Sequence, residues 1–170
     1  PGRESKNVYF AGCTASYVEN DIGKASVRLL DEAGVDFTTV GEKENCCGTP
    51  MLVAGKWDVF ADTLKKNIQA VKEAGADTVI SSCPACDMMW RNVYPEWAEK
   101  LGIEYNIKAR HYSEVVSEKI KSKEFSFPEN GNGKKPIKVT WHDSCHIGRA
   151  SGVYDEPREL IKAIPGVELV

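Results

Sequence analysis

The sequence has no excess of positive charge and no long apolar segment. Its 22 lysines and arginines are outnumbered by 25 aspartates and glutamates, which gives a net charge of −3. Proteins that bind nucleic acids through the phosphate backbone usually carry a basic patch, so this composition argues against a nucleic-acid partner. No apolar run approaches the roughly 20 residues that span a bilayer. Direct membrane insertion is therefore not expected, and membrane attachment would come only through a partner protein.

The sequence also gives little sign of a secreted, disulfide-bonded protein. Its first residues, PGRESKN, are polar, unlike the apolar segment of a signal peptide. A chain of 170 residues is long enough to form a core without cross-links. Its six cysteines are therefore predicted to be reduced ligands or redox groups in a reducing, cytoplasmic compartment.

Strand and helix patterns alternate along the chain. Short β-branched or apolar runs predict strands at 7–12, 35–40, 77–82 and 137–143. Apolar residues at helical spacing predict helices at 20–33, 56–74, 87–101, 113–122 and 156–164, with a break or kink in the third at Pro95. This alternation predicts an α/β fold with an open parallel sheet and flanking helices.

One segment has the composition of a linker. The stretch KEFSFPENGNGKKP, at 123–136, is rich in glycine, asparagine, proline and lysine. It divides the chain into a predicted first domain at 1–122 and a second segment at 137–170.

The cysteines follow the predicted strands. They are Cys13, the adjacent pair Cys46 and Cys47, the CPAC pair Cys83 and Cys86, and Cys145. In an open parallel sheet, the loops at the carboxyl ends of the strands meet in one crevice. We therefore expect thiols that are far apart in the sequence to lie close together in the fold.

The first five cysteines have the spacing C-x32-CC-x35-C-x2-C, which leaves four interpretations open. Free cysteines can be small core residues. The CPAC sequence before a helix is typical of a redox-active dithiol, but this gives the other three cysteines no role. Four of the five thiolates could hold a structural zinc ion. All five could bind an iron–sulfur cluster, in which adjacent, diverging sulfurs would bind different irons.

The arrangement resembles the cysteine-rich CCG domain of heterodisulfide reductase and related iron–sulfur oxidoreductases. The family pattern of a cysteine, then CCG, then CxxC falls on Cys13, on Cys46-Cys47-Gly48 and on Cys83-Pro84-Ala85-Cys86. The resemblance implies a Rossmann-like domain in which all five cysteines bind a [4Fe-4S] cluster of non-cubane type, with zinc as the alternative in an isolated piece. It also implies that WHDSCHIGR, at 141–149, begins a second, truncated repeat whose first cysteine is Cys145.

The same resemblance implies redox chemistry at a sulfur–sulfur bond: reduction of a disulfide, a heterodisulfide or a sulfur-carrier trisulfide, or the reverse oxidation of a dithiol. The segments SYVENDIGKASVRLLDEAG and SCPACDMMWRNVYPEWAEKLGI are most similar to the heterodisulfide-reductase-like component of the membrane complex associated with dissimilatory sulfite reductase. The implied partners are other redox subunits and a small sulfur-carrier protein. The alternatives are electron transfer to a quinone, as in the glycolate oxidase relatives, and a structural zinc module.

Two histidines flank the last cysteine. His142 and His146 are candidates for moving protons to a leaving thiolate near neutral pH, and with Cys145 they form the predicted catalytic set. His111 is expected at the surface. A further group, Met88, Met89, Trp90 and Trp97, has helical spacing and is expected in the core.

Overall fold

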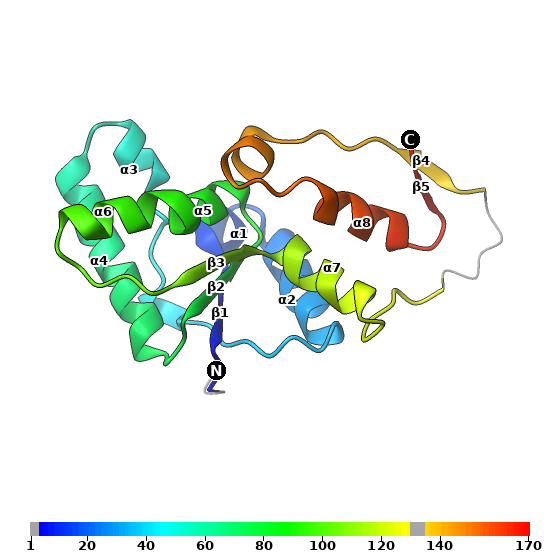
Figure 1. Cartoon of the computed structure of the whole chain (residues 1–170), viewed down its shortest axis with the longest axis horizontal. Coiled ribbons are helices and arrows are strands. Elements are labelled where there is room, and N and C mark those ends of the chain that lie inside the picture. Colours follow the sequence, from blue (N-terminus) through cyan, green and yellow to red (C-terminus); the bar gives the residue numbers. More distant parts are fainter. Residues whose placement is uncertain (1–3, 130–134) are drawn as a thin grey trace.

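The computed structural model describes residues 4–129 and 135–170 and has an α/β architecture (Figure 1). Three strands, β1 (Asn7–Phe10), β2 (Thr78–Ser81) and β3 (Lys108–His111), form a sheet in the order β1-β2-β3. Both strand pairs are parallel. The predicted fold class is therefore confirmed, although five residues of the predicted linker, 130–134, lie outside the described part of the chain.

Helices cover both faces of the sheet. They are α1 (Gly12–Tyr17), α2 (Asn20–Glu32), α3 (Thr49–Val53), α4 (Trp57–Glu73), α5 (Pro84–Met88), α6 (Tyr94–Lys100), α7 (Tyr112–Lys121) and α8 (Asp155–Ala163), with short helical turns at Gly41–Lys43 (η1), Met89–Val93 (η2) and Cys145–Ala150 (η3). The predicted helices at 20–33, 56–74, 113–122 and 156–164 are confirmed to within two residues at either end. None of the helices in the described residues is long and apolar enough to cross a bilayer.

The alternation of side chains along the strands builds two cores. Val8 and Phe10 pack with α4 and with the helical stretch from α5 to α6, whereas Tyr9 packs with α2, α7 and α8 on the opposite face. Met89 and Trp90 are fully buried in the first core, and Met88 and Trp97 pack against it, as predicted. The ends of these strands are therefore held in position by side-chain packing on both faces of the sheet.

The segment 35–40 is not the predicted strand. Its backbone pairs with β1 at a single parallel bridge between Val8 and Thr38, where the amide of Tyr9 donates to the carbonyl of Thr38 at 2.8 Å. The chain then turns away at Gly41, whose φ is +57°. A β-branched sequence gives strand propensity, but a strand also needs a partner along its length, and this edge segment leaves the sheet too early.

The helix is not broken at Pro95, and its irregularity lies just before the proline. The backbone of η2 forms a π-helical turn just before α6, and Pro95 then occupies the first turn of α6, where its missing amide is not needed. The helix therefore continues past the proline. Strand β3, with the sequence KARH, and strand β5 (Val167–Leu169) are not evident from the sequence, because neither carries a clear apolar alternation.

The second segment forms a small parallel pair of its own, β4 (Ile137–Val139) with β5. Helix α8 packs against the α7 face of the first sheet through Leu160. The side-chain amide of Asn92 donates to the carbonyl of Ala150 at 2.7 Å and so joins η2 to η3. The second segment thus lies against the CxxC helix of the first (Figure 1).

Candidate functional site: a cavity lined by five cysteines

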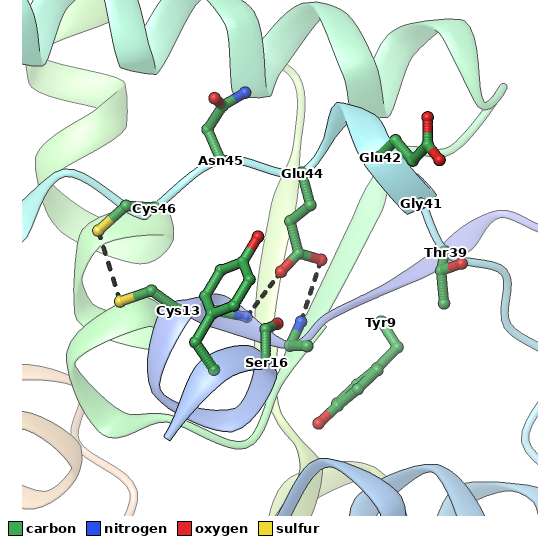
Figure 2. A pocket seen from close by; sticks show the side chains of 12 residues that line it. Tyr9, Cys13, Ser16, Thr39, Gly41, Glu42, Glu44, Asn45 and Cys46 are labelled. Atoms are coloured by element: carbon green, nitrogen blue, oxygen red, sulfur yellow. Dashed lines mark hydrogen bonds between the residues drawn. The ribbon is translucent and has the colours of Figure 1, made fainter. Parts of the chain in front are cut away.

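Cys13 follows β1 directly. The chain turns at Gly12, whose φ is +75°, and enters α1. The half-buried carboxylate of Glu44 accepts hydrogen bonds from the amides of Ala11 at 3.2 Å and Gly12 at 2.8 Å (Figure 2). Burial raises the pKa of this carboxyl, while the two amides oppose the rise. Glu44 therefore ties the Cys13 loop to the segment that carries Cys46.

The adjacent pair, Cys46 and Cys47, is held from behind by two buried side chains. Asn67 of α4 donates to the carbonyl of Cys46 and to the hydroxyl of Tyr94, both at 2.9 Å. Tyr94 in turn donates to the carbonyl of Cys47 at 3.0 Å. Asn67 also accepts from the amide of Asn45 at 3.2 Å. We call Asn67 and Tyr94 the carbonyl clamp, because together they bind both cysteine carbonyls.

The glycine after the pair allows the sharp turn into α3. Gly48 has a φ of +88°, and a Cβ added there would lie 2.6 Å from a ring atom of the buried Phe60. Two independent constraints, a left-handed backbone and a close aromatic neighbour, therefore select glycine here.

We expect Gly48→Ala to lower the free energy of unfolding by about 2 kcal/mol, because it adds backbone strain and a steric clash. The matched control is Gly34→Ala, at a φ of +67° with nothing within 4 Å of the added Cβ, which should cost only about 1 kcal/mol of strain. Urea unfolding of both variants measures the difference. Equal losses would mean that Phe60 imposes no constraint.

The CxxC pair begins a helix at the end of β2. Cys83 is the N-cap of α5, Pro84 is its first residue, and Cys86 is buried within it. This strand–helix junction explains why CPAC follows an apolar run in the sequence. It places the sulfur of Cys86 so near Gly12 that a Cβ on that glycine would lie 2.9 Å from it.

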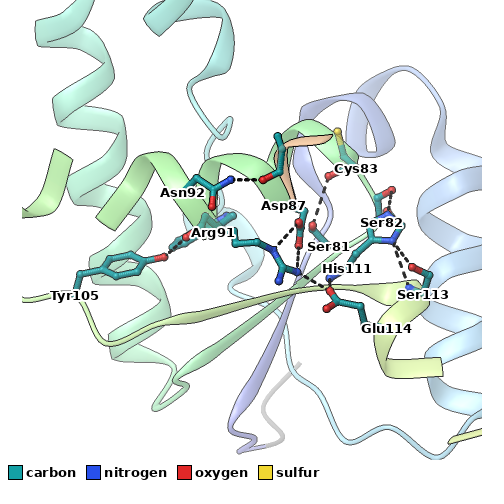
Figure 3. A network of polar contacts seen from close by, with 12 residues as sticks. Ser81, Ser82, Cys83, Asp87, Arg91, Asn92, Tyr105, His111, Ser113 and Glu114 are labelled. Atoms are coloured by element: carbon teal, nitrogen blue, oxygen red, sulfur yellow. Dashed lines mark hydrogen bonds and ion pairs between the residues drawn. The ribbon is translucent and has the colours of Figure 1, made fainter. Parts of the chain in front are cut away.

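Behind this pair lies a charged network (Figure 3). The buried carboxylate of Asp87 pairs with Arg91 at 3.0 Å, and Arg91 contacts Glu114 at 2.6 Å. Glu114 also accepts from the amide of His111 at 2.7 Å, as part of a capping box that begins α7. The network joins the CxxC helix to the end of β3.

His111 is therefore not the surface residue that the sequence predicts. It is 5% exposed, and its ring contacts the hydroxyl of Ser113 at 2.7 Å and the carbonyl of Ser82 at 3.3 Å. Burial lowers the pKa of His111 to about 4. A neutral imidazole suits this N-cap, since one ring nitrogen must accept a hydrogen bond.

The three loops bring the predicted cysteines together. Cys13, Cys46, Cys47, Cys83 and Cys86 line a single cavity of about 190 Å³, which we call the sulfur cavity. The sulfurs of Cys13 and Cys46 are 3.7 Å apart. Cys13 is exposed, whereas Cys47 and Cys86 are buried, so the cavity has an accessible side and a protected side. Within the described residues, no three histidine, cysteine or acidic side chains already converge on a single-ion site.

The buried thiols differ in acidity. Hydrogen bonding to Cys86 lowers the pKa values of Cys47 and Cys83 to about 6, while burial opposes the shift. The same hydrogen bonds raise the pKa of Cys86. Burial raises the pKa of Cys46 to about 11. Since the thiolate is the form that binds metals, the lowered pKa values favour ligand chemistry at Cys47 and Cys83.

The donor set fits an iron–sulfur cluster. Thiolates are the standard ligands of such clusters, and five sulfurs surround a cavity rather than a point. Gly12 lines this cavity, and because it has no side chain it leaves space next to the sulfur of Cys86 that a Cβ would fill. Thr49, whose hydroxyl lies 3.3 Å from the sulfur of Cys47, adds a polar group to the lining.

The predicted catalytic set lies beside the sulfur cavity rather than in its lining. Cys145 is exposed and begins η3. His146, the next residue, is close enough to Cys83 for its charge to contribute to the lowered pKa of that thiol. His142 acts instead on Asp143, whose carboxylate pairs with Arg158.

Sequence reasoning missed the residues that support the cysteines. Asn67 stands three residues after Leu64 and four before Val71, on the apolar face of its helix. A polar residue at a position where the helical pattern predicts an apolar core residue could have revealed its role. Glu44 lies in a loop and Arg91 in the predicted helix at 87–101. Neither gave such a signal, because charged residues are common in loops and on the exposed sides of helices.

Residues 7–91 and 139–170 match the family of the cysteine-rich domain, CCG. Similar proteins include a dihydromethanophenazine:CoB--CoM heterodisulfide reductase subunit from Methanosarcina mazei, which is 36% identical over 96% of this chain and 39% of its own length. A fumarate reductase (CoM/CoB) subunit from Methanothermobacter marburgensis is 34% identical over 95% of this chain and 30% of its own length. EtfAB:quinone oxidoreductase from Syntrophomonas wolfei is 32% identical over 97% of this chain and 22% of its own length. The chain thus spans well under half of these relatives.

Proposed function

This chain belongs to the cysteine-rich domain (CCG) family, and we propose that it binds an iron–sulfur cluster in a redox subunit that acts on sulfur–sulfur bonds. The observation that carries the proposal is the sulfur cavity, where five cysteines from three loops share one lining. We propose Cys13, Cys46, Cys47, Cys83 and Cys86 as the ligands. Relatives named as heterodisulfide reductase subunits support the reaction class.

A cluster bound there would supply single electrons for chemistry at a sulfur–sulfur bond. The chain's own residues orient and shield that chemistry. The carbonyl clamp holds the adjacent cysteines, and the buried thiols of Cys47 and Cys86 keep water from the inner side. The exposed thiol of Cys13 leaves the outer side open to a substrate. We assign to the imidazole of His146, beside Cys83, the proton for a departing thiolate.

Two finer assignments belong to the same proposal. The family match at 139–170 supports a second repeat that begins after the linker, in which Cys145 would be a ligand and His142 its neighbour.

The partners would be other redox subunits, with a small disulfide or a sulfur-carrier protein as substrate. The relative named EtfAB:quinone oxidoreductase favours a second candidate, electron transfer to a quinone.

The test is anaerobic analysis of iron, acid-labile sulfide and zinc, with electron paramagnetic resonance. We expect about four irons and about four sulfides per chain. Cys47→Ser should lose more than about half of the iron, because it removes a buried ligand. Cys145→Ser, at an exposed cysteine outside the sulfur cavity, is the matched control and should keep the iron of this cavity, because Cys145 would be a ligand only in the second repeat.

About one zinc per chain without iron or sulfide would contradict the redox proposal and favour a structural zinc module. With iron present, reduction of a disulfide by the loaded protein, compared with reduction of a quinone, separates the two redox candidates.

A further inference from the structure

A fully buried hydrogen-bond donor in the first core has no acceptor. The side chain of Trp90 is 0% exposed, and its indole Nε1–H has no hydrogen-bond partner within residues 4–129 and 135–170. The phenols around it are satisfied: the hydroxyl of Tyr94 donates to the carbonyl of Cys47, and that of Tyr105 donates to the carbonyl of Trp90 (Figure 3). Buried N–H groups are nearly always hydrogen-bonded, so an exception indicates a partner that arrives from outside the chain.

Trp90 lies one helical turn after Cys86. Both residues belong to one continuous helical stretch, because η2 follows α5 directly. Side chains four residues apart share one side of a helix, and long side chains lean over the turn before their own. The indole is therefore directed toward the turn that carries Cys86.

The packing around the indole points to the same place. Its ring meets the ring of Phe10 edge-on, with the centroids 5.5 Å apart. The ring of Phe10 and the sulfur of Cys86 both lie within 4 Å of the position that a Cβ on Gly12 would take. Trp90, Cys86 and Cys47 belong to one cluster of buried residues. The unpaired donor thus lies in the core that backs the sulfur cavity.

A bound iron–sulfur cluster would bring acceptors to this core. A metal-bound thiolate accepts hydrogen bonds and donates none, and the sulfides of a cluster also accept. A reduced cluster carries one more negative charge than an oxidised one, so a neutral donor stabilises the reduced form more strongly. Hydrogen bonds to the sulfurs are one of the features that set a cluster's reduction potential.

We propose that the indole N–H of Trp90 donates a hydrogen bond to the sulfur of Cys86 when that sulfur binds a cluster, and that this bond favours the reduced cluster. The inference rests on the proposed function and names a residue that adjusts the same site. Trp90 is not a ligand in this arrangement. It sets how readily the group held by the five cysteines accepts an electron.

Trp90→Phe tests the bond, because it removes the donor and keeps an aromatic ring. The parent chain and the variant are loaded anaerobically with iron and sulfide, and the reduced fraction of the cluster is measured by electron paramagnetic resonance at a series of fixed solution potentials. At a given potential, we expect the ratio of reduced to oxidised cluster to fall about three- to tenfold in Trp90→Phe.

The matched control is Trp97→Phe. Trp97 packs on the ring of Phe60 beside the same core, and its indole nitrogen is not among the buried unpaired donors of the described residues. The same loss of atoms there should leave the ratio within about twofold of the parent value.

A second measurement does not depend on how well Trp90→Phe folds. With isotope-labelled indole nitrogens, hyperfine spectroscopy of the reduced cluster detects a nitrogen whose proton is bonded to a cluster sulfur. We expect this coupling in the parent chain and in Trp97→Phe, and its loss in Trp90→Phe.

Three results would overturn the inference: an unaltered ratio in Trp90→Phe, an equal fall in Trp97→Phe, or a loaded parent chain without the nitrogen coupling. A buried water would then be the partner of the indole. A parent chain that takes up no iron would overturn the proposed function and this inference together, whereas a loaded chain without the coupling would overturn this inference alone.

Discussion

Replacing Arg91 by methionine is expected to lower the free energy of unfolding by about 3 to 5 kcal/mol. The side chain of Asp87 is fully buried, and Arg91 contacts both of its oxygens, at 3.0 and 3.1 Å. Methionine would fill part of the space but would leave a carboxylate in the interior without its cation. Glu114 would lose the same partner, so two acidic groups would be uncompensated at once.

The matched control is Arg110→Met. Arg110 pairs with Glu118, whose side chain is 66% exposed, so water can solvate the carboxylate after the change. Exposed ion pairs contribute about 1 kcal/mol or less. Urea unfolding of both variants measures the contrast. A loss in Arg110→Met as large as in Arg91→Met would show that burial of Asp87 is not the cause.

Asn67→Ala is expected to destabilise the chain by about 3 kcal/mol and to reduce its iron content. The amide of Asn45 and the carbonyl of Cys46 would lose their partner, and an unsatisfied buried polar group costs about 1 to 3 kcal/mol. Tyr94 would keep its bond to the carbonyl of Cys47 but lose its own donor. The adjacent cysteines would then be less well ordered as ligands.

Gln69→Ala is the control for this effect. Gln69 lies on the same helix and is exposed, and within residues 4–129 and 135–170 its side chain bonds only to Glu73, so its loss should cost less than about 0.5 kcal/mol. The measurements are thermal unfolding and iron per chain. Tyr94→Phe separates the two parts of the carbonyl clamp. It removes the hydrogen bond to the carbonyl of Cys47 but leaves the bond from Asn67 to the carbonyl of Cys46. Unchanged stability and iron in Asn67→Ala would show that the clamp has no positioning role.

Much of this fold could be predicted from the sequence, because its long helices carry a regular apolar period. The buried positions Phe60, Leu64, Ile68 and Val71 recur at helical spacing and identify α4. The convergence of Cys13 with Cys83 and Cys86 also followed from their positions after β1 and β2. Strand prediction was less successful, since β3 is short and charged and the β-branched segment 35–40 meets its neighbour at only one bridge.

The surroundings of the cysteines could not be predicted, because they depend on contacts between distant segments. Glu44 bonds to amides 32 and 33 residues away, and Tyr94 to a carbonyl 47 residues away. Local patterns carry no information on such pairings. His111 illustrates the same limit, since its ring contacts the carbonyl of Ser82, which is 29 residues away in the sequence.

The origin of the five sulfurs in three separate loops has a mechanical consequence. Cys13 and Cys46 are 33 residues apart, so anything that binds the whole set cross-links distant parts of the chain. Closing long loops removes conformations from the denatured ensemble, and a group that binds the native state alone opposes unfolding by mass action. Occupancy of the sulfur cavity and resistance to unfolding are thereby coupled, so oxidative loss of the bound group would also expose the chain to degradation.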